Sequence, residues 1–247
     1  MSKIKISLVS LGRLKYPVNM AYLQGWKSRI FTISHDSEIL HLPGANGSDW
    51  EYTTDQLAGL VHPTHNADFT IAIIGAPIQD NYYMKRVGEK VAVLSLHEMA
   101  DIVRFSDFSI EHYILRNIYE LVVLYVANGK LFPANTYTWV HDDVRGCLFD
   151  LNSNKPDIVF SMHRPNLCDA CKSRVLSLQI DTDFLPALNN ELPRLQKTLY
   201  FRISDWVKAH PICALLITLL SGITLNILAS IIFKYYVDPM LALVLNE

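Results

Sequence analysis

The sequence has no strong excess of charge of either sign. Its 22 lysine and arginine residues and 24 aspartate and glutamate residues leave a formal net charge of −2. Proteins that bind nucleic acid through phosphate contacts normally have a basic surface, so the composition contains no nucleic-acid signature. Internal repeats and low-complexity tracts are also lacking, and half of the 247 residues are hydrophobic, which indicates enough material for a folded core.

Several motifs of enzymes and of exported proteins are missing as well. The sequence contains no G-x-S-x-G, no Walker-type loop and no dinucleotide fingerprint, so the hydrolase, NTPase and dehydrogenase classes have no support and a non-enzymatic role is favoured. In the N-terminal stretch MSKIKISLVSLGRLK, lysines interrupt the apolar residues, and the apolar run is too short for a signal peptide. We therefore expect the N-terminal part to stay in the cytoplasm.

One long segment lacks charge altogether. Residues 211–233, PICALLITLLSGITLNILASIIF, would form a helix of about 34 Å, enough to cross a hydrocarbon core of about 30 Å. Before it, basic residues outnumber acidic ones: Arg194, Lys197, Arg202 and Lys208 stand against Asp205. The positive-inside rule then predicts a single-pass protein of the inner or cell membrane with its N-terminal domain in the cytoplasm.

Small or polar residues recur at intervals of four within this apolar segment: Ala214, Thr218, Gly222, Asn226 and Ser230. In a helix these positions form one continuous strip, and small residues at this spacing let two helices approach closely. An asparagine in mid-membrane is costly unless it meets a partner or water. The strip predicts a homo-oligomer in the bilayer that encloses a gated pore; the alternative is a simple anchor whose small residues face lipid.

Cysteine is scarce, yet three of the four cysteines lie close together. Cys147, Cys168 and Cys171 fall within 25 positions, whereas Cys213 lies in the apolar segment. Cytosolic thiols stay reduced, so a disulfide is disfavoured. Cys168 and Cys171 have the C-x-x-C spacing at which two thiolates bind one ion, so we predict a structural zinc site; the alternative is three buried free cysteines.

A tetrahedral zinc site needs four ligands, and Cys147 supplies the third. For the fourth we favour His141, because a tight turn at Arg145-Gly146 would present it together with Cys147; His163, close to Cys168, is the alternative. Asp142 and Asp143, beside His141, are expected to orient the imidazole rather than to bind the ion.

The remaining sequence predicts a mixed α/β domain. Short β-branched runs indicate strands at residues 4–9, 29–33, 69–74 and 91–94, and residues 109–129 have the periodicity of a long central helix capped by Ser109. The expected organisation is an α/β domain with a zinc knuckle at residues 1–180, a linker at 181–193, a basic juxtamembrane helix at 194–210, a transmembrane helix at 211–233 and a short tail at 234–247.

A strand ending in AVLSLHEM, a long helix, a histidine-containing loop, a cysteine and then C-x-x-C follow one another between residues 68 and 176. This order resembles the archaemetzincin family of zincin-type metalloproteases, whose central helix carries HELGH and whose second zinc is held by a cysteine-rich knuckle. The resemblance implies that the knuckle corresponds to Cys147, Cys168 and Cys171, with His141 where a further cysteine is expected.

The catalytic motif of that family is not preserved. At the HELGH positions this chain has Tyr119-Glu120-Leu121-Val122-Val123, and the position of the third histidine falls on Gly129. Tyrosine and valine cannot replace the imidazoles that such a zinc requires. The resemblance therefore implies a zincin-like scaffold that keeps a structural zinc and has lost the catalytic one.

These features favour a membrane-anchored, zinc-stabilised sensor or effector that responds to a small ligand or regulatory partner, oligomerises through its helix and acts on the bilayer. The architecture resembles that of membrane-acting effectors of bacterial antiviral defence, including ion channels. Two alternatives stay open: a membrane-tethered zinc metalloprotease that uses other histidines, and a tethered adaptor.

Overall fold

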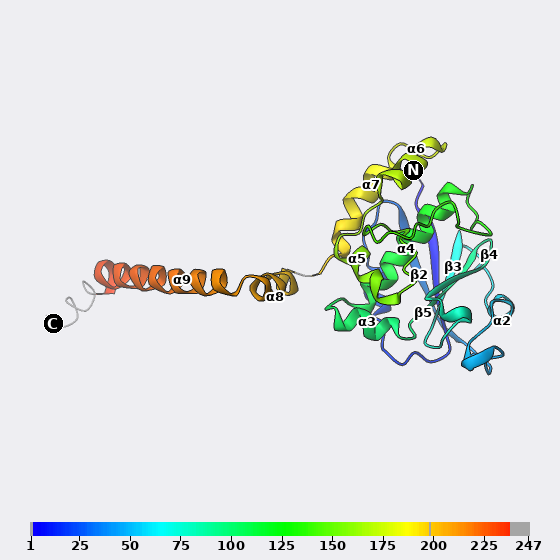
Figure 1. Ribbon diagram of the computed structural model, residues 1–247, viewed down its shortest axis with the longest axis horizontal. Coiled ribbons are helices and arrows are strands. Elements are labelled where there is room, and N and C mark those ends of the chain that lie inside the picture. The colour runs from blue at the N-terminus through cyan, green and yellow to red at the C-terminus, as the bar shows by residue number, and fades with distance from the viewer. Residues whose placement is uncertain (1, 198, 238–247) are drawn as a thin grey trace. The chain divides into compact units, whose positions relative to one another are not determined.

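The computed structural model describes residues 2–197 and 199–237, which form two compact units. The first unit ends at Gln196 and the second begins at Lys197 (Figure 1). Residues 238–247, most of the expected C-terminal tail, lie outside the described residues.

A five-stranded sheet forms the centre of the first unit, in the order β2-β1-β3-β5-β4. The strands are β1 (Ile4–Leu11), β2 (Phe31–Leu40), β3 (Phe69–Ile74), β4 (Met84–Gly88) and β5 (Val91–Ser95). All neighbours pair in parallel except β4, which runs antiparallel to β5 at the edge. The predicted mixed α/β fold is confirmed.

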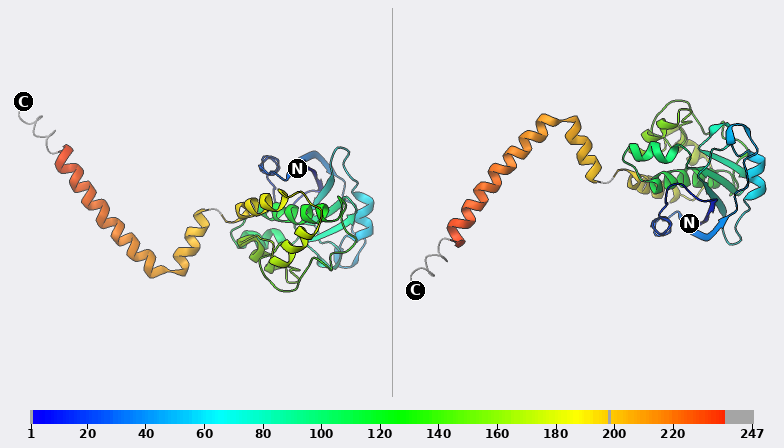
Figure 2. Two further views of the ribbon diagram at one scale, coloured as in Figure 1. Left: turned by 90° about the horizontal axis from the view of Figure 1, so that it is seen from above. Right: turned by 90° about the horizontal axis from the view of Figure 1, so that it is seen from below.

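Both faces of the sheet are buried, as parallel strands covered by helices require. Alternate residues of β1 point to opposite sides: Ile6 and Leu8 enter the larger core, whereas Val9 and Leu11 enter the smaller one. The larger core includes residues of α1 (Met20–Gln24), α3 (Met99–Phe105), α4 (Ile110–Ala127), α5 (Ile158–His163), α6 (Asp169–Ser177) and α7 (Phe184–Glu191). Figure 2 shows α2 (Thr54–Leu60) on the opposite side of the sheet.

The long helix α4 is the central helix that the sequence predicts. Ser109 caps its start by accepting a hydrogen bond from the His112 backbone N–H at 3.1 Å. Gly129, with φ +65°, follows its end. Burial is not confined to one face of this helix. Its polar residues Arg116 and Glu120 also lie in the interior.

The strands differ from the sequence prediction mainly at the edges of the sheet. β3 has the predicted bounds, while β2 begins at Phe31 and continues to Leu40. Strand β4 was not predicted. Its sequence MKRVG is only partly buried, because an edge strand has one neighbour and needs no apolar run.

Residues 181–193, expected to be a linker, are part of the folded domain. They contain α7 and lead into a 3₁₀ turn, Leu192–Leu195, and Phe184, Leu188 and Leu192 are buried in the larger core. These three residues recur every four positions, which is a helical stripe. Pro186 lies in the first turn of α7, where its missing N–H costs nothing.

Arg194 also belongs to the domain rather than to the juxtamembrane helix. Its guanidinium donates to the Lys27 carbonyl at 2.6 Å and lies 4.2 Å from the centre of the Trp26 ring. The folded domain therefore extends to Gln196, beyond the expected boundary at residue 180.

The described residues of the second unit form two helices and a π turn. α8 (Leu199–Ala209) is amphipathic, and α9 (Pro211–Ile232) continues into the π turn Phe233–Val237. Pro211 begins α9, a position that proline favours because no N–H is needed there. By length and composition, the stretch Pro211–Tyr235 could cross a membrane, and none of it is buried.

A candidate metal centre

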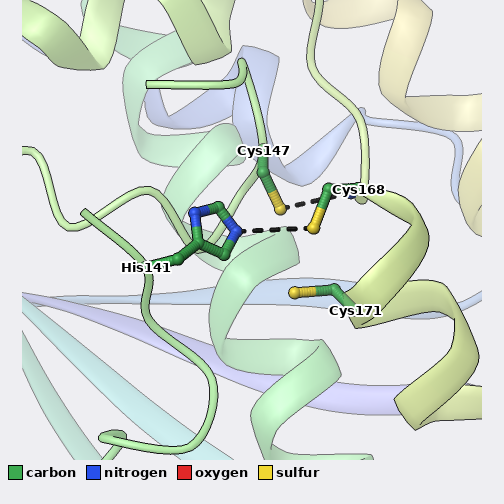
Figure 3. Close-up of side chains that lie close together, drawn as sticks. All are labelled: His141, Cys147, Cys168 and Cys171. Atoms are coloured by element: carbon green, nitrogen blue, oxygen red, sulfur yellow. Dashed lines mark hydrogen bonds between the residues drawn. The ribbon is translucent and has the colours of Figure 1, made fainter. Parts of the chain in front are cut away.

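Four side chains predicted as zinc ligands converge in the first unit. The ligand atoms of His141, Cys147, Cys168 and Cys171 all lie within 4.8 Å of one another (Figure 3). Cys147 and Cys171 are buried, and the other two are partly exposed. This group could hold a metal ion.

Backbone pairing within one loop brings the first two ligands, His141 and Cys147, together. His141 lies beside Asp150 because its N–H donates to the Phe149 carbonyl at 3.2 Å and its own carbonyl accepts from Leu151 at 3.0 Å. The chain then reverses at Gly146, whose φ of +72° suits glycine.

A second backbone bridge places the C-x-x-C pair against this turn. Cys147 pairs with Asn166, and the Leu148 N–H donates to the Asn166 carbonyl at 2.9 Å. Two residues later Cys168 forms the N-cap of α6, and Cys171 lies in the first turn of that helix. Thiolates are favoured at this end of a helix, because its N–H groups carry partial positive charge.

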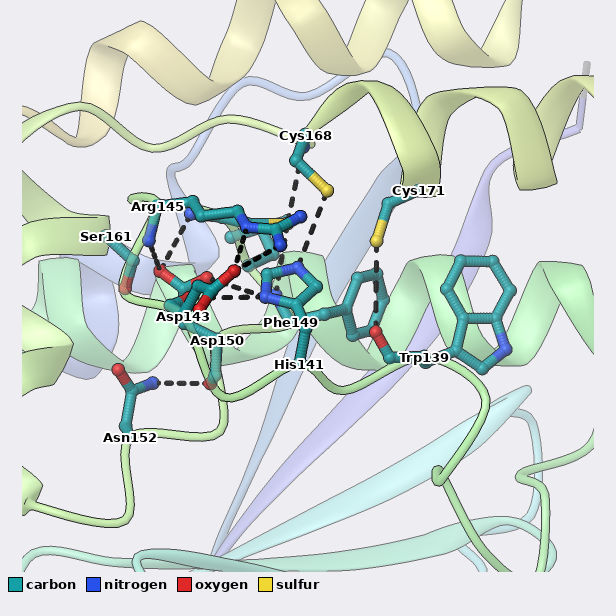
Figure 4. Close-up of polar contacts among 12 residues, drawn as sticks. Trp139, His141, Asp143, Arg145, Phe149, Asp150, Asn152, Ser161, Cys168 and Cys171 are labelled. Carbon is teal, nitrogen blue, oxygen red and sulfur yellow. Dashed lines mark hydrogen bonds and ion pairs between the residues drawn. The ribbon is translucent and has the colours of Figure 1, made fainter.

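The surroundings of His141 determine which of its nitrogens can bind an ion. Nδ1 lies 3.2 Å from the Asp150 carboxylate and 3.3 Å from the Asp143 carbonyl, both acceptors (Figure 4). Nδ1 must therefore carry the proton. Nε2 keeps its lone pair and points at the Cys168 sulfur, 3.5 Å away. At zinc sites the other nitrogen of a histidine ligand usually donates to a carboxylate or a backbone carbonyl, and here its hydrogen bond goes to the Asp143 carbonyl.

Asp150 is itself held in place. One carboxylate oxygen accepts from the backbone N–H groups of Arg145 and Cys147, both at 3.0 Å, so this side chain fixes the turn, while the other oxygen faces Nδ1 of His141. The sequence predicted that Asp142 and Asp143 would orient the imidazole; Asp143 contacts it through its backbone carbonyl, and Asp150 is the neighbour that the sequence did not indicate. The overlooked signal is the spacing: Asp150 follows Cys147 by three residues.

The Cys147 sulfur accepts several hydrogen bonds. The backbone N–H groups of Cys168 and Phe149 donate to it at 3.4 and 3.5 Å. Together with the Cys171 thiol, which has the largest effect, they lower the pKa of Cys147 to about 4. The same interaction raises the pKa of Cys171, since that thiol keeps the shared proton. The surroundings of Cys147 thus favour the thiolate form of at least one cysteine in the metal centre.

The donor set fits zinc. A tetrahedral ion with metal–sulfur bonds of about 2.3 Å has sulfurs roughly 3.8 Å apart, within the 4.8 Å span of this group. One imidazole and three thiolates form a common structural set that leaves no open position. The arrangement suits an ion that stabilises the fold and does not suit one that activates water.

The alternative ligand His163 lies elsewhere. It is exposed at the end of α5, and its ring packs edge-on against Phe108, with centroids 5.1 Å apart. It is not among the side chains that converge on Cys168.

The positions that correspond to a catalytic zinc motif are committed to core contacts. The Tyr119 hydroxyl accepts from Trp26 at 3.0 Å and donates to the buried Glu191 carboxylate at 2.7 Å. Glu120 pairs with the fully buried Arg116, and Val123 is buried. Within the described ranges, no second group of metal-ligand side chains occurs.

Comparisons with known proteins find one distant similarity. No protein-family profile and no curated protein matches this chain. Among solved structures, a crystal structure of archaemetzincin from Methanopyrus kandleri is similar, with 15% sequence identity and a TM-score of 0.44. The similarity covers 71% of this chain and 94% of that one.

Proposed function

We propose that this chain is a single-pass membrane protein with a zinc-stabilised cytoplasmic domain that binds a small ligand or regulatory partner. The helix α9 tethers the domain, oligomerises and acts on the bilayer, as a pore-forming or channel-type effector would. The single observation that carries the zinc part is the convergence of His141, Cys147, Cys168 and Cys171.

A binding role is favoured over peptidase activity because the metal centre has no free position for water. A peptidase would need a second ion with an open coordination site. Glu120 cannot serve as its general base, since its carboxylate is paired with Arg116 in the core. The tethered metalloprotease is therefore the weaker alternative. A protease assay with and without a zinc chelator distinguishes a metalloprotease from a binding protein.

We expect Glu120→Gln to leave the biological activity of the protein intact when it is assayed below the melting temperature of the variant. The substitution removes the charge opposite Arg116, so it should weaken the fold, but it removes no catalytic group. Casein or peptide cleavage by the purified wild type and variant, with and without a zinc chelator, is the measurement, and we expect no cleavage by either chain. A chelator-sensitive proteolytic activity that Glu120→Gln abolishes would contradict this view.

The polar strip of α9 supports assembly in the membrane. The Thr218 and Ser230 hydroxyls donate to the carbonyls of Ala214 and Asn226, both at 2.9 Å, and so satisfy themselves within the helix. The Asn226 amide, by contrast, has no hydrogen-bond partner among the residues that the structure describes. In hydrocarbon, an amide without a hydrogen-bond partner costs on the order of several kcal/mol. The Asn226 amide therefore needs a partner from another chain or from water.

We therefore expect Asn226→Leu and Gly222→Leu to reduce the oligomer while leaving membrane insertion unchanged. Leucine removes the interhelical hydrogen bond at one position and blocks close approach at the other. Light scattering in mild detergent measures the assembly, and Leu220→Ala, an exposed apolar residue on the face away from the strip, is the control. If both variants keep the wild-type mass and membrane activity, α9 is only an anchor.

One preparation distinguishes the functional alternatives. Metal content and mass are measured on the same purified full chain in detergent. An oligomer with one zinc per chain and no proteolysis supports the sensor or effector, whereas a zinc-containing monomer supports the tethered adaptor.

A further inference from the structure

A cleft of about 760 Å³ lies next to the metal centre and shares His141 with it. The edge strand β4 forms one wall, and the loop at residues 134–142 forms another. His141 and Asp150 contribute at the metal side, and Glu120 of α4 also lines it. Pockets for small molecules have volumes of roughly 300–1,000 Å³, so this cleft has the capacity for one small organic ligand.

Arg86 is a cation in this cleft that keeps unused hydrogen-bond donors. Its Nε donates to the Pro133 carbonyl at 3.3 Å, and within the described part of the chain no hydrogen bond or ion pair engages its two terminal nitrogens. The neighbouring cation, Lys85, is already used: it pairs with Asp80 at 3.3 Å and lies 4.5 Å above the Tyr82 ring.

The environment of Arg86 makes an anion favourable there. Burial lowers the pKa of Arg86, because the charged guanidinium is partly removed from water. Glu120 acts against this shift from a distance, but Glu120 is paired with Arg116 and forms no ion pair with Arg86. A planar guanidinium with two unused N–H-bearing nitrogens matches the two oxygens of a carboxylate.

The rest of the lining restricts the class of anion. Glu120, Asp142 and Asp150 also line the cleft, so a multiply charged phosphate would meet three carboxyl groups. A single negative charge placed at Arg86 avoids most of that repulsion. Tyr82, Tyr83 and Tyr137 supply aromatic surface, which suits an apolar or aromatic body.

We propose that this cleft binds a small organic monocarboxylate, with its carboxylate on the terminal nitrogens of Arg86 and its apolar body against the tyrosines. The inference rests on the proposed function, since it names the site and the chemical class of the ligand that the domain senses. The cleft also reaches the metal centre at His141, so an occupant would contact the same loop that holds one of the metal ligands.

The experiment compares N-acetylphenylalanine with its neutral carboxamide by calorimetry on the full chain in detergent. For the wild type we expect the carboxylate to bind about tenfold or more tightly than the carboxamide, since the bond to Arg86 is charge-assisted. Arg86→Gln should abolish this preference, and Arg86→Lys should keep part of it. Arg13→Gln, at an exposed arginine in the loop after β1, is the matched control and should change nothing. A tripeptide ending in phenylalanine separates a free acid from a chain end as the source of the carboxylate.

Zinc content and melting temperature are measured on each sample, so that a failure of the fold is distinguished from a failure of the site. Equal binding of the two probes, no binding of either at millimolar concentration, or a preference that survives Arg86→Gln in a folded variant overturns the inference. If the protein is an oligomer with one zinc per chain but does not prefer the carboxylate over the carboxamide, the proposed function remains and the ligand inference fails. If zinc-free protein shows this preference, the ligand inference holds and the zinc part of the proposed function fails.

Discussion

Cys171→Ser is expected to unfold the domain and to lower its zinc content from about one ion per chain to well below half. Binding of a structural zinc contributes roughly 10–16 kcal/mol in small zinc-binding peptides, whereas a whole domain is stable by only about 5–15 kcal/mol. A serine hydroxyl is a poor substitute for a thiolate, so much of that contribution disappears. Plasma emission analysis of the metal and circular dichroism during heating measure the two effects.

The chain offers a matched control. Cys213→Ser makes the same change on α9, at a cysteine that is not among the metal ligands, and should alter neither quantity. Cys168→Ser should behave like Cys171→Ser. The zinc assignment fails if the wild-type chain contains well under half an equivalent of zinc and both cysteine variants stay folded.

Arg116→Met is expected to destabilise the domain by about 3–5 kcal/mol, because it leaves the carboxylate of Glu120 buried without its partner. Arg116 is fully buried and also donates to the Ser161 hydroxyl at 3.1 Å and to the Leu148 carbonyl at 2.6 Å. Burial raises the pKa of Glu120, and Arg116 opposes this shift. Urea unfolding measures the loss, with the exposed residue Arg13 changed to methionine as the control.

The double variant Arg116→Met/Glu120→Leu tests the cause. When both charges are replaced by apolar side chains, no buried charge is left unpaired, so much of the lost stability should return. The explanation is wrong if Arg116→Met lowers the free energy of unfolding by less than about 1 kcal/mol. It is also wrong if the double variant loses more stability than the two single variants, Arg116→Met and Glu120→Leu, lose together.

The Leu148 bond links this ion pair to the metal centre. Leu148 follows Cys147 directly, and its own N–H pairs with Asn166 near the C-x-x-C segment. Arg116 thus fixes the backbone from which one metal ligand projects. We expect the zinc affinity of Arg116→Met to fall along with its stability.

Local patterns were sufficient for several elements. The bounds of β3, the cap of α4 at Ser109 and the apolar helix α9 follow from side-chain periodicity and from single capping residues, which act within a few positions of one another. The grouping of Cys147 with the C-x-x-C pair was also predictable, because a shared ion is an ordinary reason for such spacing among cysteines.

Long-range contacts decided the rest. The sequence contained two histidines near the cysteines, and only the pairing of His141 with Phe149 and Leu151 brings one of them to Cys168, while His163 packs on Phe108. Residues 181–193 have the prolines of a linker, but α7 docks on the core because Glu191 accepts hydrogen bonds from Ser28 at 2.6 Å and from Tyr119 at 2.7 Å. Sequence spacing determines which side chains can share a face, whereas the choice among distant partners depends on which surfaces the folded chain brings into contact.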